Sequence, residues 1–364
     1  MSMKIIQVCP RFLPCIGGIE THVYEISRRL VKNNEVFIFT TDPSGKLPKE
    51  EIIDGIKVRR FKSFAPNESY FFSFELLSAM KKENCDILHL HSFHSMTSFL
   101  SYLATDKCRP KKFIFTPHYN IGAGSKFRDF LHIFYDPIQK KLFWKANKVI
   151  CVSKYEKDII EKKFGVPEEK IVYIPNGLNL EEFERVEKQK KLYDFEILFV
   201  GRLEKYKRVQ EAIYALKPII EKYPDKNIHF TIVGKGPYKK SLIKLAKDLG
   251  LSDKVSFEEN IPQKDLIKIY KRVDIFSIFN RHEAFSISTF EALACNKPVI
   301  APNVGIFREH KENNYSIFLF DNNREFMSIL ESMIGKEYNF KNNLESYDWG
   351  EITKKIELIY TDGG

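Results

Sequence analysis

Residues 274–301 read DIFSIFNRHEAFSISTFEALACNKPVIA. The segment opens with a short run of aromatic and β-branched residues, Asp274–Phe279, passes through a polar loop into a stretch of helical length, and ends in a second apolar run, Pro298–Ala301. A strand, a helix and another strand in succession are typical of a βαβ unit, whose two strands lie parallel in one sheet. This stretch therefore predicts an α/β fold built on parallel strands.

The same alternation of short apolar runs and helical stretches extends in both directions along the chain. We expect strands at 4–9, 35–40, 56–61, 86–91, 112–116, 148–152 and 171–174, and again at 195–200, 228–233, 255–257, 274–279, 298–301 and 316–320. Two doubly wound, Rossmann-like parallel-sheet domains follow from this pattern. A ligand is expected in a cleft between them, outside the carboxyl ends of the strands.

The boundaries of these domains are predicted from composition. The stretch 179–194 is rich in Glu and Lys and poor in apolar residues, so we expect it to link an N-terminal domain (1–178) to a C-terminal domain (195–344). The tail 345–364 repeats apolar residues at helical spacing, which predicts a helix that packs back on the N-terminal domain.

Length and composition are those of a folded enzyme-sized chain. The 364 residues are 43% hydrophobic and 29% charged, which excludes a disordered chain and allows two domains with sizeable cores. No apolar run approaches the roughly 20 residues that cross a bilayer, so neither a transmembrane helix nor a signal peptide is expected. The six cysteines are scattered without a Cys-x-x-Cys pair, which favours a reducing cytoplasm and no zinc motif.

The positive charge is concentrated in the N-terminal half. Residues 1–180 hold 28 Lys and Arg against 19 Asp and Glu, whereas residues 181–364 hold 30 against 29. Two aromatic-rich stretches of the basic half, 61–74 and 126–148, could form a rim that faces an acceptor or an anionic membrane, since basic and aromatic side chains favour such an interface. The alternative is a solvated basic face over a buried aromatic stripe.

Two positions of the N-terminal half could carry chemistry. Gly17 and Gly18 separate the first strand from a helix expected at 21–32, where backbone can approach a ligand and helix amides suit an anion. The spacing is not Gly-x-Gly-x-x-Gly, and a tight turn without a ligand is the alternative. His118 follows the strand 112–116, at the edge of the sheet where active-site groups collect. The histidines at 89, 91 and 94 lack a carboxylate at ligand spacing, so no metal site is predicted.

The C-terminal half presents a cationic pair after its first strand. Gly201 and Arg202 end the run 195–202, and Lys207 stands five residues beyond Arg202. A planar guanidinium and a flexible ammonium beside a helix start could clamp a diphosphate. Two solvated charges are the equally weighted alternative.

The loop and helix of the opening stretch carry two acids. Glu283 precedes the helix and Glu291 lies within it, and eight helical positions rise about 12 Å, so the two carboxylates can address different parts of one extended ligand. Amides near Phe285, Ser286 and Ile287 should be unpaired at the helix start and available to an anion. Glu291 lies among apolar neighbours, where a polar ligand such as ribose would compensate for its burial.

In order and spacing, these motifs resemble those of the group 1 glycosyltransferases, also called glycosyltransferase family 4, with the two-domain GT-B fold. The resemblance covers nearly the whole chain. The segments that carry it are Gly17–Glu20, the His118 segment, Ile174–Asn179, Gly201-Arg202 with Lys207, Ile232–Pro237, the Glu283/Glu291 pair and Ala294–Ile300.

The resemblance implies a retaining enzyme that moves a hexose-type sugar from a UDP- or GDP-sugar to an acceptor hydroxyl. Arg202 and Lys207 would hold the diphosphate, Glu283 the sugar hydroxyls and Glu291 the ribose, with His118 near the reacting carbon. The residues implied to bind the donor are Gly17, Gly18, Gly201, Arg202, Lys207, Gly234, Ile261, Glu283, Ala284, Phe285, Ser286, Ile287 and Glu291. The chain has no Asp-x-Asp, so cationic side chains are expected to replace a metal at the diphosphate, and neither a cofactor nor an enzyme nucleophile is assigned.

Some positions depart from the family pattern. Ser286 stands where the family usually has glycine, Asn296 follows Cys295 in place of glycine, and Ile306 follows Gly305 in place of a second glycine. Glu259-Asn260 replaces a frequent glycine before the base-binding stretch. These departures make the identity of the donor less transferable than the class of reaction.

By resemblance the acceptor belongs to the basic N-terminal domain, and a lipid-linked glycan acceptor with peripheral contact to an anionic cytoplasmic membrane face is expected. Two other function classes remain. One is a GT-B relative with epimerase or phosphorylase activity. The other is a non-enzymatic nucleic-acid or glycan-binding protein, suggested by the basic half, although no nucleic-acid motif is present and no nucleic-acid partner is predicted.

Overall fold

The computed structural model describes residues 2–66, 70–119, 136–137, 139–313, 315–338 and 340–362. The chain forms two compact units: unit 1 comprises Met1–Gly177 and Tyr347–Gly364, and unit 2 comprises Leu178–Ser346. Within the described residues no helix is both long and apolar enough to cross a membrane.

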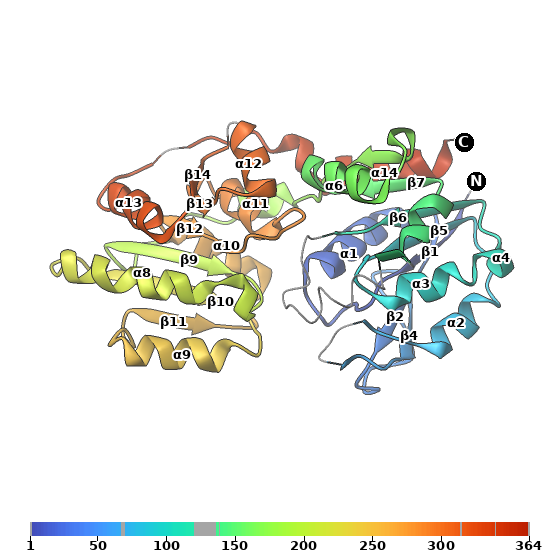
Figure 1. Cartoon of the computed structure of the whole chain (residues 1–364), viewed down its shortest axis with the longest axis horizontal. Helices are drawn as coiled ribbons and strands as arrows, with labels where there is room; N and C mark the ends of the chain where they lie inside the picture. The colour runs from blue at the N-terminus through green and yellow to red at the C-terminus, as the bar shows by residue number, and fades with distance from the viewer. Residues whose placement is uncertain are drawn as a thin grey trace. The chain divides into compact units, whose positions relative to one another are not determined.

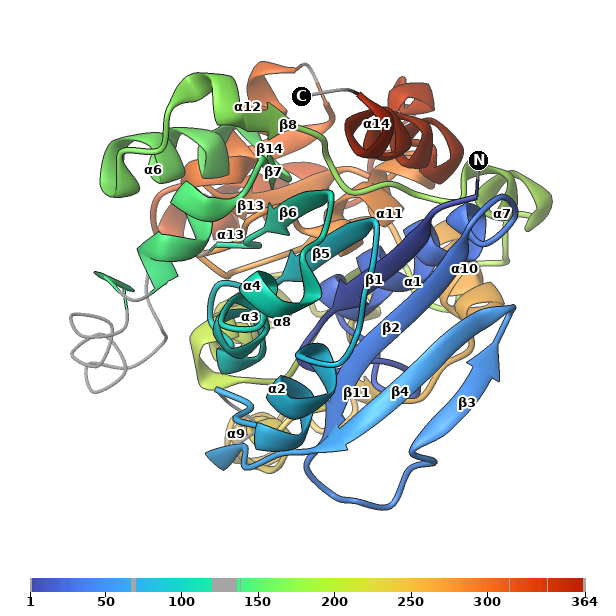
Figure 2. The same ribbon diagram turned by 90° about the vertical axis from the view of Figure 1, so that its right-hand side faces the viewer.

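Unit 1 is built on an eight-stranded sheet with the strand order β3-β4-β2-β1-β5-β6-β7-β8, much of which can be followed in Figure 2. Its strands are β1 (Lys4–Val8), β2 (Glu35–Asp42), β3 (Glu50–Ile53), β4 (Ile56–Lys62), β5 (Ile87–His91), β6 (Lys112–Thr116), β7 (Lys148–Cys151) and β8 (Ile171–Tyr173). All neighbours pair in parallel except β3, which is antiparallel to β4. The sequence analysis misses β3 because this edge strand is short, acidic and largely exposed.

Helices cover both faces of this sheet. They are α1 (Gly18–Leu30), α2 (Phe74–Met80), α3 (Met96–Tyr102), α4 (Thr105–Cys108), α6 (Lys154–Phe164) and α14 (Trp349–Thr361), with 3-10 turns η2 (Glu168–Lys170) and η4 (Glu345–Tyr347). The helix α6 shows why such segments stop where they do: Ser153 caps its first turn by accepting from the Glu156 N–H, and Gly165 ends it at φ +63°.

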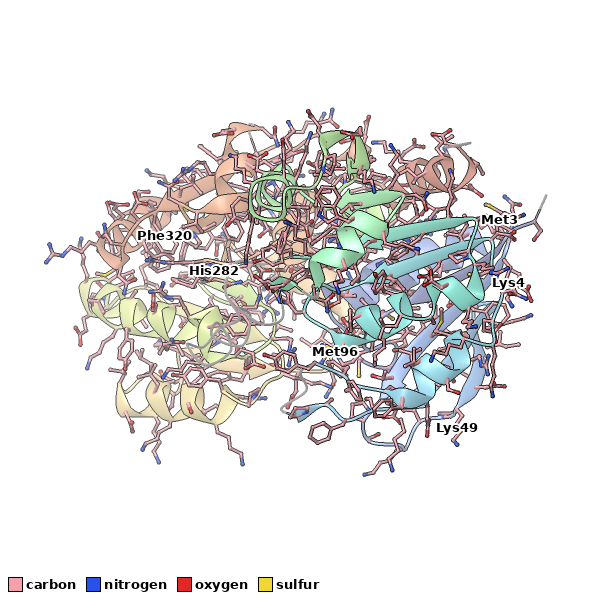
Figure 3. The ribbon with its side chains drawn as sticks, turned by 45° about the vertical axis from the view of Figure 1, so that its right-hand side comes forward. Met3, Lys4, Lys49, Met96, His282 and Phe320 are labelled. Carbon is pink, nitrogen blue, oxygen red and sulfur yellow. The ribbon has the colours of Figure 1, made fainter. Side chains whose placement is uncertain are left out.

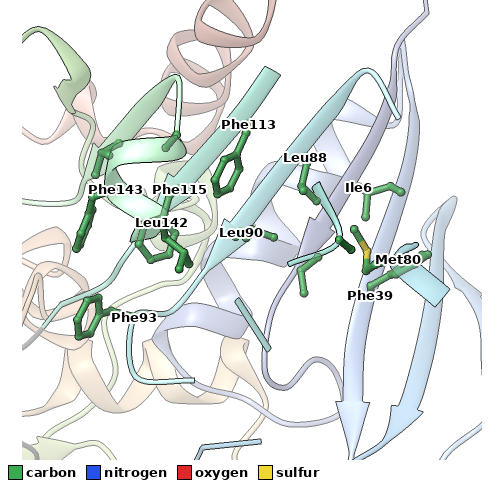
Figure 4. Packing of buried hydrophobic residues seen from close by; sticks show 14 of the residues in the cluster. Ile6, Phe39, Met80, Leu88, Leu90, Phe93, Phe113, Phe115, Leu142 and Phe143 are labelled. Atoms are coloured by element: carbon green, nitrogen blue, oxygen red, sulfur yellow. The ribbon is translucent and has the colours of Figure 1, made fainter. Parts of the chain in front are cut away.

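Alternate residues of each strand pack on opposite faces. On one face, Ile6, Leu88 and Phe115 join side chains of α2, α4 and α6 in a core that Figure 4 shows from close by. On the other face, Ile5 and Ile114 pack against α1 and the C-terminal helix α14. The tail helix therefore completes a layer of unit 1.

Unit 2 has a six-stranded sheet, all parallel, with the order β11-β10-β9-β12-β13-β14 (Figure 1). Its strands are β9 (Phe195–Val200), β10 (Ile228–Val233), β11 (Val255–Glu258), β12 (Ile275–Ser277), β13 (Val299–Pro302) and β14 (Ile317–Phe320). Its helices are α7 (Leu180–Arg185), α8 (Val209–Lys222), α9 (Lys239–Asp248), α10 (Gln263–Arg272), α11 (Ile287–Ala294), α12 (Gly305–Glu312) and α13 (Asn323–Met333), with the 3-10 turn η3 (Lys205–Lys207). The helix α8 buries Val209, Ile213 and Leu216 at helical spacing, which turns its apolar stripe toward the core.

The predicted fold class, two Rossmann-like parallel-sheet domains, is confirmed. The linker prediction for 179–194 needs correction, because Leu180–Arg185 forms the helix α7 and the whole segment belongs to unit 2. Its apolar anchors are few but buried: Phe183 and Val186 are 4% and 7% exposed. The average composition of the segment does not reveal these two apolar residues, because most of their neighbours are charged.

Candidate functional site

The site residues predicted in unit 2 gather at one edge of its sheet. Gly201 and Arg202 follow β9, Gly234 follows β10, Ile261 lies beyond β11, and Glu283 lies beyond β12. Because all six strands are parallel, their carboxyl ends share one edge, where ligands of open α/β sheets bind. His282, labelled in Figure 3, marks the loop that carries Glu283.

Glycines hold the first two of these loops close together. A Cβ on Gly234 would lie 1.8 Å from the Gly201 carbonyl oxygen, and a Cβ on Gly236 would lie 2.2 Å from that of Leu203. Backbone hydrogen bonds join the loops, from Gly201 N to Val233 O at 3.0 Å and from Leu203 N to Lys235 O at 2.7 Å. Gly234 therefore positions the loop that carries Arg202, and its contacts do not require a ligand.

Lys207 and Glu283 form an ion pair between two loops that are distant in sequence. The Lys207 ammonium donates to Glu283 Oε1, and their side chains are only 15% and 17% exposed. Burial lowers the pKa of Lys207, but the charge of Glu283, the nearby Tyr206 and the hydrogen bond to Glu283 together outweigh burial, so the pKa is raised and the ammonium stays charged. An ammonium has three donors, so Lys207 can hold Glu283 and a phosphate oxygen together.

Arg202 lies in the same loop but is more exposed. Its Nη2 donates to Glu204 Oε1 at 3.1 Å, and 39% of the side chain is accessible. A guanidinium presents several donors in a planar fork, a geometry that suits a bidentate anion. Nothing in the sequence marks Glu204 as the partner of Arg202 except that it lies two residues further along the chain.

The helix α11 begins at a strained position. Ser286, its N-cap, has φ +70° and ψ +75°, the left-handed region that favours glycine, and its Oγ lies 2.8 Å from Thr289 Oγ1. Among the described residues no acceptor is found for the backbone N–H groups of Ser286, Ile287 and Ser288. The first turn of α11 thus offers donors and a positive dipole end to an anion.

Glu291 is held by partners from another helix. Its Oε2 accepts from the Tyr270 hydroxyl at 2.9 Å and its Oε1 from Gln263 Nε2 at 3.1 Å. Burial raises the pKa of Glu291 despite these hydrogen bonds. The helix α10 thus supplies hydrogen-bond partners for this acid within the protein, and the ribose contact stays a prediction.

The helical-spacing estimate for the two acids also needs correction. Glu283 lies four residues before α11 and is separated from it by the left-handed Ser286, so the distance expected for eight helical residues does not apply. His310 of α12, a residue that sequence reasoning missed, lies with Nε2 3.3 Å from the Phe285 carbonyl oxygen. This buried imidazole supports the loop between the two acids.

In unit 1, Gly17 is the N-cap of α1 and Gly18 its first residue. A Cβ on Gly17 would meet only the end of the Glu20 side chain, at 2.5 Å, so the turn itself does not demand glycine there. Gly17 has extended backbone with φ −172°. The Glu20 carboxylate thus occupies the space beside Gly17 at the N-terminus of α1.

His118 lies two residues beyond β6 in the left-handed region, with φ +46°, and is 8% exposed. The next residue, Tyr119, donates its backbone N–H to Glu156 Oε1, while Val152 N donates to Glu156 Oε2 at 2.7 Å. Burial raises the pKa of Glu156 to about 8. This acid, which the sequence did not single out, fixes the loop that carries His118.

The fold separates the histidines at 89, 91 and 94, which are close in the sequence, into different surroundings. Both nitrogens of His89 are occupied, Nδ1 by the Tyr360 hydroxyl at 2.6 Å and Nε2 by Thr116 Oγ1 at 2.7 Å. Among the described side chains, the group close enough to share an ion is His22, His91 and His118.

The two aromatic-rich stretches of the predicted rim contain both buried and exposed rings, and their role toward an acceptor or membrane stays a prediction. In the stretch 61–74, Phe61 and Phe71 are buried, whereas Phe64 and Phe74 are 72% and 71% exposed. In the stretch 126–148, Phe143 is buried and Trp144 is 48% exposed. Phe127, Phe130 and Phe134 lie outside the described residues.

Family models match both units. The model described as Glycosyltransferase Family 4 matches residues 16–182, and the model described as Glycosyl transferases group 1 matches residues 181–357. The chain belongs to the group 1 glycosyltransferases. This confirms the resemblance seen in the motifs and makes the protein a glycosyltransferase of the GT-B type.

Particular relatives lie at low identity but cover the whole chain. An uncharacterised glycosyltransferase of Methanocaldococcus jannaschii is 28% identical over 98% of each chain. The phosphatidylinositol N-acetylglucosaminyltransferase GPI3 subunit of Saccharomyces cerevisiae is 22% identical over 100% of this chain and 83% of its own length. Anabaena HepE, solved in complex with UDP and glucose, has the same fold, with a TM-score of 0.76, 16% identity and coverage of 99% and 100% of the two chains.

Proposed function

We propose that the protein transfers a hexose-type sugar from a UDP-sugar to an acceptor hydroxyl with retention of anomeric configuration. The observation that carries this proposal is the Lys207–Glu283 pair, which lies at the same sheet edge as Arg202 and the unpaired amides of α11. Cations and amides would face the diphosphate, and a carboxylate would face the sugar hydroxyls.

The chemistry explains why such groups are needed. When the bond between the sugar carbon and the diphosphate oxygen breaks, negative charge grows on the departing diphosphate. Fixed cations and helix amides stabilise this charge without reorganising, which is the main source of rate enhancement in such sites. The side chains of Arg202 and Lys207 would supply this stabilisation with no metal at the diphosphate.

The choice of UDP over GDP rests on the neighbour that was solved with UDP and glucose. Glu291 would accept from the ribose hydroxyls, in the orientation that Tyr270 and Gln263 give its carboxylate. The left-handed Ser286 would bring backbone close to the sugar, at the position where glycine is usual in the family.

The acceptor would be a lipid-linked glycan or glycolipid that meets unit 1. The exposed Phe64 and Phe74 belong to one cluster, because Phe64 and Phe72 exchange backbone hydrogen bonds at 2.8 and 2.9 Å and the Phe72 and Phe74 rings are 4.6 Å apart. Exposed aromatic rings on the more basic half of the chain suit an anionic lipid surface. The yeast relative carries phosphatidylinositol in its name, which is consistent with a lipid acceptor.

Thermal unfolding with UDP-, GDP- and ADP-sugars tests the donor, because a ligand that binds the native state raises the melting temperature. We expect a shift with a UDP-sugar, unchanged by EDTA and lost in Arg202→Ala. The control is Lys222→Ala, which breaks the exposed Lys222–Glu331 pair (2.7 Å) of unit 2 and should keep the shift. No shift with any donor, or a shift that EDTA abolishes, would contradict the proposed site. The configuration of the product, read from its anomeric NMR signal, tests retention.

Co-sedimentation with liposomes that contain anionic lipid tests the acceptor side. The protein should bind at low salt, and Phe64→Ser with Phe74→Ser should release it. Tyr214→Ser, on α8 of unit 2 and outside both aromatic-rich stretches, is an exposed-aromatic control that should keep binding. Equal sedimentation of the double variant would exclude a role for the Phe64 cluster.

A further inference from the structure

Three histidines from separate elements of unit 1 converge in its interior. His22 lies in α1, His91 is the last residue of β5, and His118 follows β6. Their ring centroids form a nearly equilateral triangle, with sides of 5.4 Å (His22–His91), 5.0 Å (His22–His118) and 5.9 Å (His91–His118). His22 and His91 are fully buried, and His118 is 8% exposed.

Each ring has one buried nitrogen without a hydrogen-bond partner: Nε2 of His22, Nδ1 of His91 and Nε2 of His118. One ligand nitrogen of each ring lies within 4.8 Å of those of the other two. A buried polar atom without a partner costs free energy, and three together need a common explanation. A shared ion or a water would supply partners to all three.

The other nitrogens show which tautomers are present. Gln7 Nε2 donates to Ser27 Oγ at 2.7 Å, so its Oε1 faces His91 Nε2 at 2.9 Å and accepts from it. The Asn176 Oδ1 likewise accepts from His22 Nδ1 at 2.7 Å. Because those nitrogens carry the protons, the unpartnered nitrogens of His22 and His91 present lone pairs.

This is the arrangement of metal-binding histidines, each of which donates its second ring N–H to an oxygen that fixes its orientation. The tautomers of His22 and His91 leave a lone pair on each unpartnered nitrogen, which is the form of imidazole that binds metal. Zinc–nitrogen bonds of about 2.0–2.1 Å in tetrahedral geometry place ligand nitrogens about 3.4 Å apart. The rings would therefore turn inward by roughly 1 Å.

We propose that His22, His91 and His118 bind a single divalent transition-metal ion of the zinc type, with water or hydroxide as the fourth ligand. Three neutral imidazoles leave the ion's charge uncompensated, so an anionic fourth ligand is favoured. Gln7 and Asn176 are the positioning residues of this site.

The bound ion would be coordinated by His118 Nε2, the nitrogen that has no hydrogen-bond partner in the protein. The family resemblance implies that His118 contacts the sugar near the reacting carbon, so bound zinc is expected to slow transfer, and EDTA is expected to restore it. This kinetic consequence rests on the proposed function, whereas ion binding does not.

The test is zinc binding to the EDTA-treated full chain, measured by competition with a chromophoric chelator. We expect one ion per chain, with affinity lowered at least about 100-fold in His91→Gln and in His118→Gln and about tenfold or more in Gln7→Leu. Cobalt(II) should give the visible absorption bands of a tetrahedral site, and those bands should vanish in the same variants. Because His118 lies at the edge of the cluster, its variant decides the question if His91→Gln unfolds.

Two controls separate this site from other ligands. His229→Gln in unit 2 removes another histidine with an unpartnered buried nitrogen, and Cys15→Ser removes the exposed thiol. Both should bind zinc as the unaltered protein does. Affinity that is unchanged in His118→Gln, or lost in Cys15→Ser, would overturn the proposal whether or not the enzyme transfers sugar. Zinc binding without inhibition would leave the ion site standing and contradict the role of His118.

Discussion

The polar cluster at the candidate site of unit 2 and the histidine cluster of unit 1 are built in different ways. In unit 2 the charged groups are paired: Lys207 with Glu283, and Glu196 with Arg272, whose Nε and Nη2 reach the carboxylate at 2.9 and 2.6 Å. In unit 1 the histidine cluster is neutral, and each of its three rings keeps a buried nitrogen without a partner. A charged site is thus assembled in one unit and a neutral one in the other.

The difference shows that net charge does not locate an anion site. The basic half of the chain is unit 1, yet the buried ammonium of Lys207 belongs to the nearly neutral half. Surface charge acts over a Debye length of about 8–10 Å and steers encounters, whereas a partly buried pair acts on the bound ligand in a lower dielectric. The comparison predicts that cations of unit 2, more than the excess in unit 1, control donor binding.

The largest effect is expected for Lys207→Met. Removing one preorganised donor from a site that stabilises developing charge typically lowers kcat about 10²–10³-fold. Leaving Glu283 unpaired and mostly buried should also cost about 2 kcal/mol of stability. Steady-state kinetics and urea unfolding measure the two effects separately.

The double variant Lys207→Met with Glu283→Gln sharpens this test. It removes the unpaired charge, so most of the stability should return while transfer stays slow. Recovery of both stability and activity would mean that the pair is structural, and the contrast between the units would lose its functional meaning.

The sequence predicts the elements of both units better than it predicts the contacts of the site. Strands and helix starts follow from local periodicity, so Gly201, Glu283 and Glu291 could be assigned to a loop or a helix correctly. The partners of site residues come from distant elements: Tyr270 of α10 donates to Glu291, and His310 of α12 lies against the Phe285 carbonyl oxygen. No local pattern encodes such pairs, because packing of distant elements decides them.

The histidine cluster illustrates the same limit. The strand order β1-β5-β6 brings His91 beside His118, and α1 brings His22 over both. From the sequence, the histidines at 89, 91 and 94 are close in the chain but predict no metal site, and His22 and His118 are not connected with His91. Alternation along β5 does place His89 and His91 on one face of the sheet. The hydroxyls of Tyr360 and Thr116, however, hydrogen-bond to both ring nitrogens of His89.

The next largest effect is expected on stability in Gly234→Ala. Its Cβ would lie 1.8 Å from the Gly201 carbonyl oxygen at φ +155°, so backbone must move and the cost should be about 3 kcal/mol or more. Gly250→Ala, at φ +74° with nothing within 4 Å, should cost only about 1 kcal/mol. Equal losses in urea unfolding would show that the loops of unit 2 are not held by this close approach.

Acid should destabilise unit 1 through its histidines. Burial lowers the pKa of His22 to about 4, although the hydrogen bond to Asn176 opposes the shift. Between pH 6.5 and 4 the unfolded chain therefore binds a proton that the folded chain does not, so stability falls as pH falls, by about 3 kcal/mol for this group. His22→Gln should lose less stability than the unaltered protein over that range.

The quantity to compare is the difference in unfolding free energy between the unaltered protein and His22→Gln at each pH. Burial raises the pKa of Glu156 to about 8, so this acid acts in the opposite sense and removes stability as pH rises from about 4.5 toward 8. Since both proteins contain Glu156, subtraction cancels its contribution. A flat difference between pH 4.5 and 7 would contradict a neutral His22 in the folded protein.

The smallest effect separates binding from chemistry in unit 2. Tyr270→Phe removes the hydroxyl that donates to Glu291 at 2.9 Å while the ring keeps its contact with Phe276, at 5.8 Å between centroids. One lost hydrogen bond is worth about 1 kcal/mol, so the donor KM should rise about fivefold with kcat unchanged. Tyr24→Phe breaks the matching exposed bond to Asp54 in unit 1 and should leave KM unaltered. If Tyr270→Phe lowers kcat instead, Glu291 acts near the reacting carbon. If neither kcat nor KM changes, the hydrogen bond between Tyr270 and Glu291 serves only the fold. The charged groups of unit 2 would then not form one ligand site.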